Sequence, residues 1–350
     1  MLAAAVFFPL QTNAVSAQKA YVLDAVSGRV LFEKNSTDQS LIASTTKIMT
    51  ALVVCEQCNV LDRMRIPKEA VGIEGSSMYL KEGEVLTLQE LLYGLMLSSG
   101  NDAAVALAIY CGGTVQGFAE MMNDKAHILG LKDTHFENPN GLDSPGHYST
   151  ARDLAVLAAY AMENPIFAKT VSTKSVKIGE RYLTNHNKLL WRVSGADGVK
   201  TGFTKAAGRV LVSSAVRNDR RLIAVTIHAP DDWNDHAVLL EEGFSGYRMQ
   251  TLVRKGQCVG LREVLGGQEQ WVQVLAAEDF SYALATDEDA QLALPGQHFA
   301  YAPAVAGADA GFAYVLIQGK AVGKFPVVYG ETVEQTITEE QGFWERLFGK

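Results

Sequence analysis

The sequence lacks several features that would place a protein in a special class. No stretch reaches the run of about 18 apolar residues that a membrane-spanning helix needs. Positive charge is not in excess, because 31 Lys and Arg face 39 Asp and Glu, for a formal net charge of −8. Nucleic acid is therefore not an expected partner, since phosphate binding needs a basic face. A small peptide substrate remains open, because a local basic pocket can sit on an acidic protein.

Cysteine and histidine are too few and too scattered to indicate a metal site. Cys55 and Cys58 form a C-x-x-C, a spacing found in redox sites and in halves of zinc sites. Apolar helical residues flank this pair, and no second Cys/His pair lies at zinc spacing. Small buried side chains, or a structural disulfide formed after export, are the favoured interpretation. No H-x-x-x-H pairing occurs among His135, His147, His186 and His236.

The remaining composition is that of an ordinary globular protein. Hydrophobic residues make up 48% of the 350 residues and charged residues 20%, which is ample material for a core. One large domain or two unequal domains is the expected arrangement.

Residues 1–17 have the pattern of a secretory signal. The apolar run at residues 2–10 is followed by Val-Ser-Ala at residues 15–17, a small-x-small sequence typical of a cleavage site. The usual basic segment is missing, since the first Lys is Lys19. We expect the sequence to start inside a longer signal, with a merely apolar N-terminal segment as the alternative.

Hydrophobic periodicity divides the next part of the chain into β, helical and β regions. Residues 20–25 and 29–33 flank a Val-Ser-Gly turn and predict a hairpin. Residues 209–216 and 221–228 predict a second hairpin, before a helix over residues 235–247. Between the hairpins, helices are predicted over residues 46–55, 87–96, 102–110, 115–129 and 150–162. Thr87 and Glu90 have the spacing of a capping box.

This order predicts an α/β domain at residues 18–250, with one antiparallel sheet assembled from both ends of the domain. Helices would flank the sheet, and a large helical insert would separate its two hairpins. From about residue 251 the character changes to short alternating runs, such as residues 271–275 and 312–317, spaced by Gly, Pro and Asp. They predict a small all-β domain, of sandwich-like type, at residues 251–336.

The last segment, residues 337–350, has the pattern of an amphipathic tail. Phe343, Trp344, Leu347 and Phe348 lie at i, i+1, i+4 and i+5, which gathers them on one side of a helix. So short a helix is marginal in water, and we expect it to form on a lipid surface that buries its apolar face. The alternative is a frayed tail or one packed on the β-domain.

The first chemical motif is an S-x-x-K, Ser44 to Lys47, where an apolar helix is predicted to begin. That spacing brings an amine within reach of a hydroxyl as a general base, if burial and cationic neighbours lower the pKa of the amine. A second S-x-x-K, residues 16–19, lies in the expected signal. Taken alone, either could be a helix N-cap Ser with a solvated Lys.

Two further motifs follow in the chain. Ser99-Gly100-Asn101 lies after a predicted helix and offers a hydroxyl to relay a proton and a carboxamide to grip a substrate amide. Residues 200–202 read Lys-Thr-Gly at a predicted strand, whose backbone can pair with an extended peptide. Each alone is compatible with an ordinary turn. The three together, in this order and placement, match the serine penicillin-recognising enzymes.

The chain resembles low-molecular-mass D-alanyl-D-alanine carboxypeptidases over nearly all of residues 20–250. The resemblance implies the penicillin-binding/β-lactamase-like fold, no metal and no cofactor. It also implies peptidoglycan stem peptides ending in D-Ala-D-Ala and β-lactam antibiotics as ligands. The segments that carry it are residues 43–47, 75–80, 98–103, 135–143, 147–153 and 197–204.

The resemblance also implies a role for each motif residue. Ser44 would be the acyl-ester nucleophile, Lys47 the proton acceptor and Ser99 a proton relay. The enzyme would act outside the cytoplasm, peripherally on the outer face of the cytoplasmic membrane.

Substrate binding would use the other motif residues. Asn101 would bind the substrate amide, while Lys200 and Thr201 would bind the terminal carboxylate side. Gly202 would leave room for the acyl group. The backbone N–H groups of Phe203 and of the nucleophile would form the oxyanion hole.

One departure from the family concerns the substrate carboxylate. Many relatives place an Arg just after the strand equivalent to residues 222–227, and here that stretch has none. Arg209, on the adjacent predicted strand, is a candidate replacement, and a surface Arg on an edge face is the alternative.

Three other functions compete with a carboxypeptidase as interpretations of this sequence. A class A β-lactamase needs an extra Glu for deacylation in a Glu-x-x-Leu-Asn loop, which is absent between Asn101 and Lys200. A non-enzymatic peptidoglycan-binding protein would be expected to have lost Ser44 or Lys47, and both are present. A D,D-endopeptidase acting on cross-links would share every catalytic residue and stays open.

Overall fold

The computed structural model describes residues 15–296 and 298–336. It divides into two compact units, one ending at Tyr247 and the other beginning at Arg248. Within the described ranges, no helix is both long enough and apolar enough to cross a membrane.

The first unit is built on a five-stranded antiparallel sheet in the order β2-β1-β9-β8-β7. The N-terminal hairpin joins strands from the far end of the unit, because Tyr21 of β1 pairs with Val225 of β9. This confirms a sheet assembled from both ends of the domain. The strands are β1 (Lys19–Asp24), β2 (Val30–Lys34), β7 (Ala196–Thr204), β8 (Gly208–Arg217) and β9 (Arg220–Ile227).

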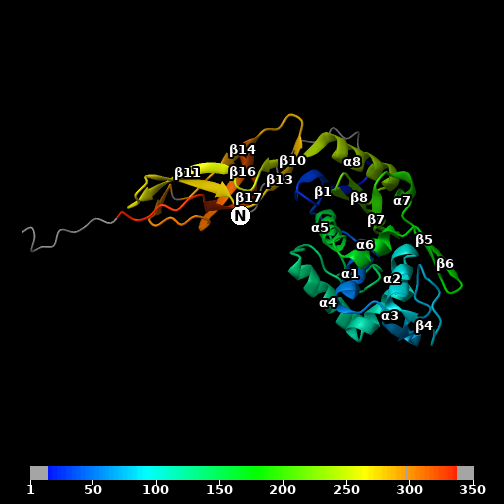
Figure 1. Ribbon diagram of the computed structural model, residues 1–350. Coiled ribbons are helices and arrows are strands. Elements are labelled where there is room, and N and C mark those ends of the chain that lie inside the picture. Colours follow the sequence, from blue (N-terminus) through cyan, green and yellow to red (C-terminus); the bar gives the residue numbers. More distant parts are fainter. Residues whose placement is uncertain (1–14, 297, 337–350) are drawn as a thin grey trace, which may run out of the picture. The chain divides into compact units, whose positions relative to one another are not determined.

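Helices cover both faces of this sheet. In Figure 1, α8 lies on one side and α1, α5 and α6 lie on the other. Contact with α8 is close, since a Cβ at its Gly243 would stand 2.8 Å from a Leu222 side-chain carbon of β9. The helices are α1 (Lys47–Gln57), α2 (Leu88–Leu97), α3 (Asn101–Gly112), α4 (Val115–Ile128), α5 (Ala151–Ala161), α6 (Pro165–Ser172), α7 (Leu189–Arg192) and α8 (Asp232–Gly246).

Four helices of the insert, α2, α4, α5 and α6, start where a local side chain accepts from free backbone N–H groups. The predicted capping box of α2 is confirmed: Thr87 Oγ1 accepts from Glu90 N, and Glu90 Oε2 accepts from Thr87 N. Helix α6 was not predicted, although Asn164 followed by Pro165 is a helix-start signal, and Asn164 Oδ1 accepts from the first-turn N–H groups.

Short elements complete the first unit. They are the turns η1 (Ala43–Thr46) and η2 (Lys68–Ala70), the pair β3 (Arg63–Arg65) with β4 (Val85–Thr87), and the hairpin β5 (Ser175–Ile178) with β6 (Arg181–Thr184).

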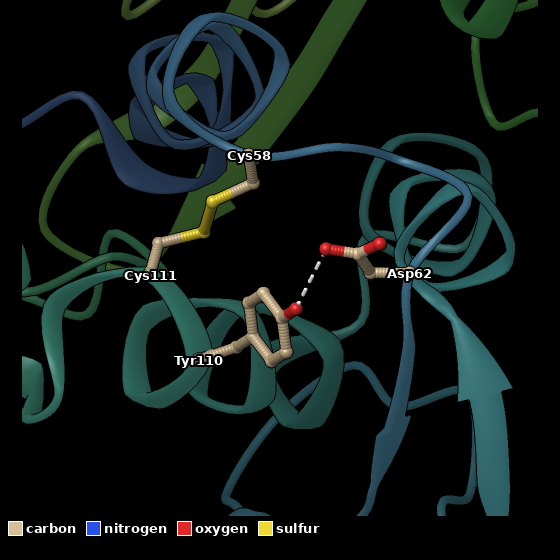
Figure 2. Close-up of a disulfide and its surroundings, with 4 residues drawn as sticks. All are labelled: Cys58, Asp62, Tyr110 and Cys111. Atoms are coloured by element: carbon tan, nitrogen blue, oxygen red, sulfur yellow. Dashed lines mark hydrogen bonds between the residues drawn. A yellow bond between two sulfur atoms is a disulfide. The ribbon is translucent and has the colours of Figure 1, made fainter.

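A disulfide joins the C-terminal ends of α1 and α3 (Figure 2). It links Cys58 to Cys111, while Cys55, the other half of the C-x-x-C, is free. Beside it, Tyr110 Oη donates a 3.0 Å hydrogen bond to Asp62 Oδ2, which raises the pKa of the tyrosine. Because α1 and α3 carry catalytic motifs at their N-terminal ends, the cross-link holds together the two helices on which the site is built.

The second unit is β-rich, as predicted, with no helix in its described residues. Strand β10 pairs with β13, and a six-stranded sheet has the order β14-β16-β17-β12-β11-β15. The strands are β10 (Tyr247–Val253), β11 (Cys258–Leu265), β12 (Trp271–Ala276), β13 (Phe280–Ala285), β14 (Ala290–Ala293), β15 (Phe299–Tyr301), β16 (Asp309–Ile317) and β17 (Lys320–Tyr329).

Two predictions concern residues at the chain ends. Residues 1–14 of the expected signal and the whole amphipathic tail, residues 337–350, lie outside the described residues. Residues 15–17 are described and pack on the first unit, where Ser16 N and Oγ and Ala17 N donate to the Asp235 carboxylate. The expected signal boundary after residue 17 and the domain boundary after residue 250 stay predictions.

Candidate active site

The nucleophile candidate Ser44 lies in the tight turn η1, just before α1. The sequence pattern had placed it at the start of the helix itself, but α1 begins only at Lys47. Ala43 enters the turn with a φ of 47°, and Thr45 Oγ1 closes it by donating to the Ile42 carbonyl at 2.6 Å. Ser44 therefore projects from a turn whose backbone is held by its own neighbours.

Lys47 is completely buried behind Ser44 and makes three hydrogen bonds. Its Nζ lies 2.9 Å from Ser44 Oγ, 2.7 Å from Asn101 Oδ1 and 2.5 Å from the Asn140 carbonyl oxygen. Burial lowers the pKa of Lys47 well below its ordinary value, and the positive charge of Lys200 lowers it further, against an opposing effect of Asp102.

The three contacts orient the amine. A neutral amine has two N–H groups, and two of the three partners of Lys47 are carbonyl oxygens that can only accept. Donating to Asn101 and Asn140 leaves the nitrogen lone pair for the hydroxyl proton of Ser44. The geometry is that of a nucleophile paired with its general base.

The Ser-Gly-Asn motif links α2 to the start of α3. Ser99 has a φ of 59° and is 5% exposed, so its hydroxyl is held in a tight turn beside the cleft. Asn101 uses both ends of its side-chain amide inside the protein, since Oδ1 accepts from Lys47 and Nδ2 donates to the Glu74 carbonyl at 2.5 Å. Contact between Asn101 and a substrate amide stays a prediction.

The Lys-Thr-Gly motif lies in the middle of β7, the edge strand of the sheet. Lys200 is 1% exposed, and burial lowers its pKa to about 7 while its Nζ donates to the Thr201 carbonyl at 2.8 Å. Gly202 comes against the nucleophile turn, because a Cβ there would stand 3.1 Å from Ser44 N. A side chain at this position would push the strand and the turn apart by a few tenths of an ångström, so glycine favours their close approach.

A cleft of about 380 Å³ opens between these elements. Six of the nine predicted site residues line it: Ser44, Ser99, Thr201, Gly202, Phe203 and Arg209. The other three, Lys47, Asn101 and Lys200, are buried. The structure thus brings together in one place three motifs that are far apart in the sequence.

Comparison with known proteins agrees with this geometry. Residues 7–231 match the family model described as D-alanyl-D-alanine carboxypeptidase, which covers well over half of the chain. Residues 247–335 match the model described as Penicillin-binding protein 5, C-terminal domain.

The chain belongs to the D-alanyl-D-alanine carboxypeptidase family.

Individual relatives agree over most of the chain. The carboxypeptidase DacD of Escherichia coli (strain K12) is 34% identical over 346 residues, covering 93% of this chain and 89% of the relative. DacF of Bacillus subtilis (strain 168) is 35% identical over 286 residues, covering 78% and 74%. The crystal structure of penicillin binding protein 5 from Haemophilus influenzae has a TM-score of 0.80 at 29% identity, covering 95% of this chain and all of that one.

The protein is accordingly a serine-type D-Ala-D-Ala carboxypeptidase of peptidoglycan metabolism, with the transpeptidase-like fold that its motifs implied. No group of three or more His, Cys, Asp or Glu that could hold a metal ion occurs in the part of the chain that the structure describes.

Arg209, the candidate carboxylate-binding residue, lies in the carboxypeptidase cleft but is paired with an acid. Its Nη2 is 2.8 Å from Asp232 Oδ1, and its guanidinium lies 5.6 Å from the centre of the Trp233 ring. Burial raises the pKa of Asp232, and the neighbouring Arg209 opposes that rise. Neither Asp232 nor Trp233 was predicted from the sequence, because only the fold brings the start of α8 to the start of β8.

Other residues of the site were also missed. Ser76, His186 and Lys188 line the cleft. His147 is 1% exposed, and burial lowers its pKa to about 4. Its Nδ1 accepts from Glu137 N, so the protonated Nε2 donates to Thr46 Oγ1 at 2.7 Å inside the nucleophile motif. The only sequence signal for Ser76 and His147 was their position within segments resembling the family, whereas His186 and Lys188 lie outside those segments.

Proposed function

We propose that the carboxypeptidase reaction proceeds through an ester on Ser44. Ser44 Oγ attacks the carbonyl carbon between the two D-Ala residues while Lys47 Nζ takes the hydroxyl proton. The C–N bond then breaks, and the proton passes through Ser99 to the nitrogen of the departing D-Ala. Water then attacks the ester carbonyl and gives a proton to Lys47, which passes it to Ser44 Oγ as the C–O bond breaks and the shortened stem peptide leaves.

One observation carries this proposal: the 2.9 Å contact between Lys47 Nζ and Ser44 Oγ, with the other two partners of the amine being carbonyl oxygens. The close approach of Gly202 to Ser44 N supports an oxyanion hole made by the N–H groups of Ser44 and Phe203. There the N–H groups would stabilise the charge that develops on the carbonyl oxygen.

Substrate recognition in this proposal combines charge and an exposed strand edge. Lys200 and Thr201 hold the terminal carboxylate, and β7 pairs with the extended peptide. Arg209 adds a further charged contact: its side chain is 41% exposed and lines the cleft, and Nη2 binds Asp232, so the guanidinium keeps further donors for a carboxylate. Asn101 would bind the substrate amide after a change in its present hydrogen bonds.

A labelled penicillin followed by a stem pentapeptide tests the reaction. Penicillin presents an amide and a carboxylate in the same relation, so peptide mapping should find its adduct on Ser44. Ser44→Ala should abolish labelling, and Lys47→Ala should slow acylation by about 100-fold or more, as expected for loss of a positioned base. Product masses should show release of one D-Ala from the pentapeptide. An adduct elsewhere, or cleavage confined to cross-linked dimers, would contradict the proposal.

We further propose that the enzyme is exported and rests on the outer face of the cytoplasmic membrane through residues 337–350. The support is the sequence pattern of these residues, with Phe343, Trp344, Leu347 and Phe348 on one helical side. Co-sedimentation with vesicles should be strong for the full chain and weak for a version ending at Glu340. Equal partitioning of the two proteins would overturn this part of the proposal.

A further inference from the structure

Tyr79 is a bulky residue in a backbone conformation that favours glycine. Its φ is 62°, in the left-handed region, and its side chain is 80% exposed. A residue of this kind persists there only when its surroundings determine the backbone, and such outliers cluster at functional sites. The exposed ring contributes little to the core, so packing does not account for the conformation.

The surroundings that hold Tyr79 centre on the buried carboxylate of Asp102, which is 1% exposed. Asp102 Oδ1 accepts from Met78 N at 3.0 Å, and Oδ2 accepts from Leu80 N at 3.0 Å and from Ser77 Oγ at 2.6 Å. Ser77 Oγ in turn accepts from Tyr79 N at 2.8 Å. One carboxylate therefore fixes the residues on both sides of Tyr79.

A second contact fixes the carbonyl of Tyr79. Arg181, at the start of β6, donates from Nη2 to the Tyr79 carbonyl at 2.7 Å. The guanidinium is held in place by Glu84, with Nη2 2.7 Å from Oε1 and Nη1 3.0 Å from Oε2. The N–H and C=O of Tyr79 are thus both used, whereas its hydroxyl has no hydrogen-bond partner within the described ranges.

The loop that contains Tyr79 is hydrogen-bonded to the Ser-Gly-Asn motif. Asn101 N donates to the Ser76 carbonyl at 2.7 Å, and Asn101 Nδ2 donates to the Glu74 carbonyl. The same Asn101 accepts from Lys47, and Ser76 lines the cleft. Residues 74–80 are therefore hydrogen-bonded to the Ser-Gly-Asn motif, and among them Ser76 lines the cleft, three residues before Tyr79.

We propose that Tyr79 is a substrate-contact residue outside the cleft, whose ring packs on a C–H-rich face of the peptidoglycan substrate upstream of the terminal D-Ala-D-Ala. This inference rests on the proposed function. The cleft of about 380 Å³ takes the reacting end of the substrate, and the rest of the polymer must leave across its rim. An aromatic ring on a backbone held in one conformation provides a large contact area at small entropic cost.

Two parts of the substrate share this chemistry: the aliphatic part of a stem side chain, and a sugar ring of the glycan. Three substrates of increasing length separate them. They are an N-blocked D-Ala-D-Ala dipeptide, the free stem pentapeptide and the disaccharide-linked pentapeptide. A stem side chain as the ligand predicts an effect on both longer substrates, whereas a sugar predicts an effect on the disaccharide-linked substrate alone.

The test compares Tyr79→Gly and Tyr79→Phe in the full chain. Glycine adopts a φ of 62° without strain, so Tyr79→Gly should unfold at the same temperature as wild type or higher. Its KM for the substrates that reach the ring, either both longer ones or the disaccharide-linked one alone, should nevertheless rise about 3- to 10-fold. That is the scale of one aromatic contact, and kcat should change little. Tyr79→Phe should restore the KM. Cleavage of the dipeptide and acylation by penicillin should stay at wild-type rates.

Tyr301→Ala is the matched control, because Tyr301 is 70% exposed but belongs to the second unit. It should change none of these values. Equal loss on all three substrates with slower penicillin acylation would show that Tyr79 only shapes the loop and would overturn the proposal. Wild-type KM values in Tyr79→Gly would do so as well. Failure of the underlying function would look different, since wild type itself would not cleave the dipeptide.

Discussion

Replacing the buried Lys200 with methionine should make the enzyme more stable and less active. Lys200 is 1% exposed, and burial lowers its pKa from 10.5 to about 7. At about 1.4 kcal/mol per pH unit, that difference corresponds to a penalty of roughly 4–5 kcal/mol for keeping the charge inside the fold. Methionine removes the charge and leaves the Thr201 carbonyl without its donor, which costs about 1 kcal/mol. The expected net gain is about 3 kcal/mol below pH 7.

The pH dependence makes this prediction specific. The folded pKa lies below the unfolded one, so the unfolded chain binds more protons between pH 7 and 10.5, and wild-type stability rises with pH in that window. The penalty is full below pH 7 and disappears near pH 10.5. The advantage of Lys200→Met should therefore shrink by about 2–3 kcal/mol between pH 6 and pH 9.

Urea denaturation at pH 6 and pH 9, followed on the transition of the first unit, measures the effect. Lys188→Met is the control, because Lys188 is exposed at the cleft and carries no burial penalty. Activity provides a second readout: removing the charge of Lys200 raises the pKa of Lys47, so the acid limb of penicillin acylation should move to higher pH. A destabilised variant at pH 6, or an advantage independent of pH, would refute the reasoning.

Three other changes test separate features. Arg209→Ala should lower carboxypeptidase turnover about 10- to 100-fold and slow penicillin acylation. The double variant with Asp232→Asn avoids leaving a buried carboxylate unpaired, and wild-type kinetics in that double variant would show that Arg209 does not bind the substrate. Replacing Cys58 and Cys111 by serine should lower the free energy of unfolding by up to about 4 kcal/mol, from a cross-link between residues 53 apart; an unchanged urea midpoint would contradict this. Thr87→Ala should cost about 1 kcal/mol at the start of α2, whereas an unchanged melting temperature would show that the cap is dispensable.

Features set by neighbours in the chain could be predicted from the sequence. The capping box at Thr87 and both hairpins depend on contacts within a few residues, so their patterns indicated them directly. The predicted ends of helices were less accurate where a contact with a distant segment determines the backbone conformation. The helix expected from residue 46 begins one residue later, after a turn that Gly141 packs against, since a Cβ there would collide with the Ala43 carbonyl.

The three catalytic motifs were also readable from the sequence, and with them the enzyme family. Their electrostatics are tertiary, because burial lowers the pKa of Lys47 and of Lys200, and the positive charge of Lys200 lowers the pKa of Lys47 further. Lysines in the same motifs on an open chain would stay charged, and Lys47 could not act as a base.

Pairings between distant residues were decided by the tertiary structure alone. The C-x-x-C pattern gave no partner for Cys58, which pairs with Cys111 at the end of another helix. Asp102 holds the backbone around Tyr79 through residues 77–80, which precede it by 22–25 positions. No local sequence pattern predicts these contacts. Motif and local periodicity were enough to predict the enzyme family and most of the strands and helices, because both depend on residues close together in the chain. The packed fold alone sets which groups have shifted pKa values, which are paired and which line the cleft, because burial and proximity exist only after distant segments come together.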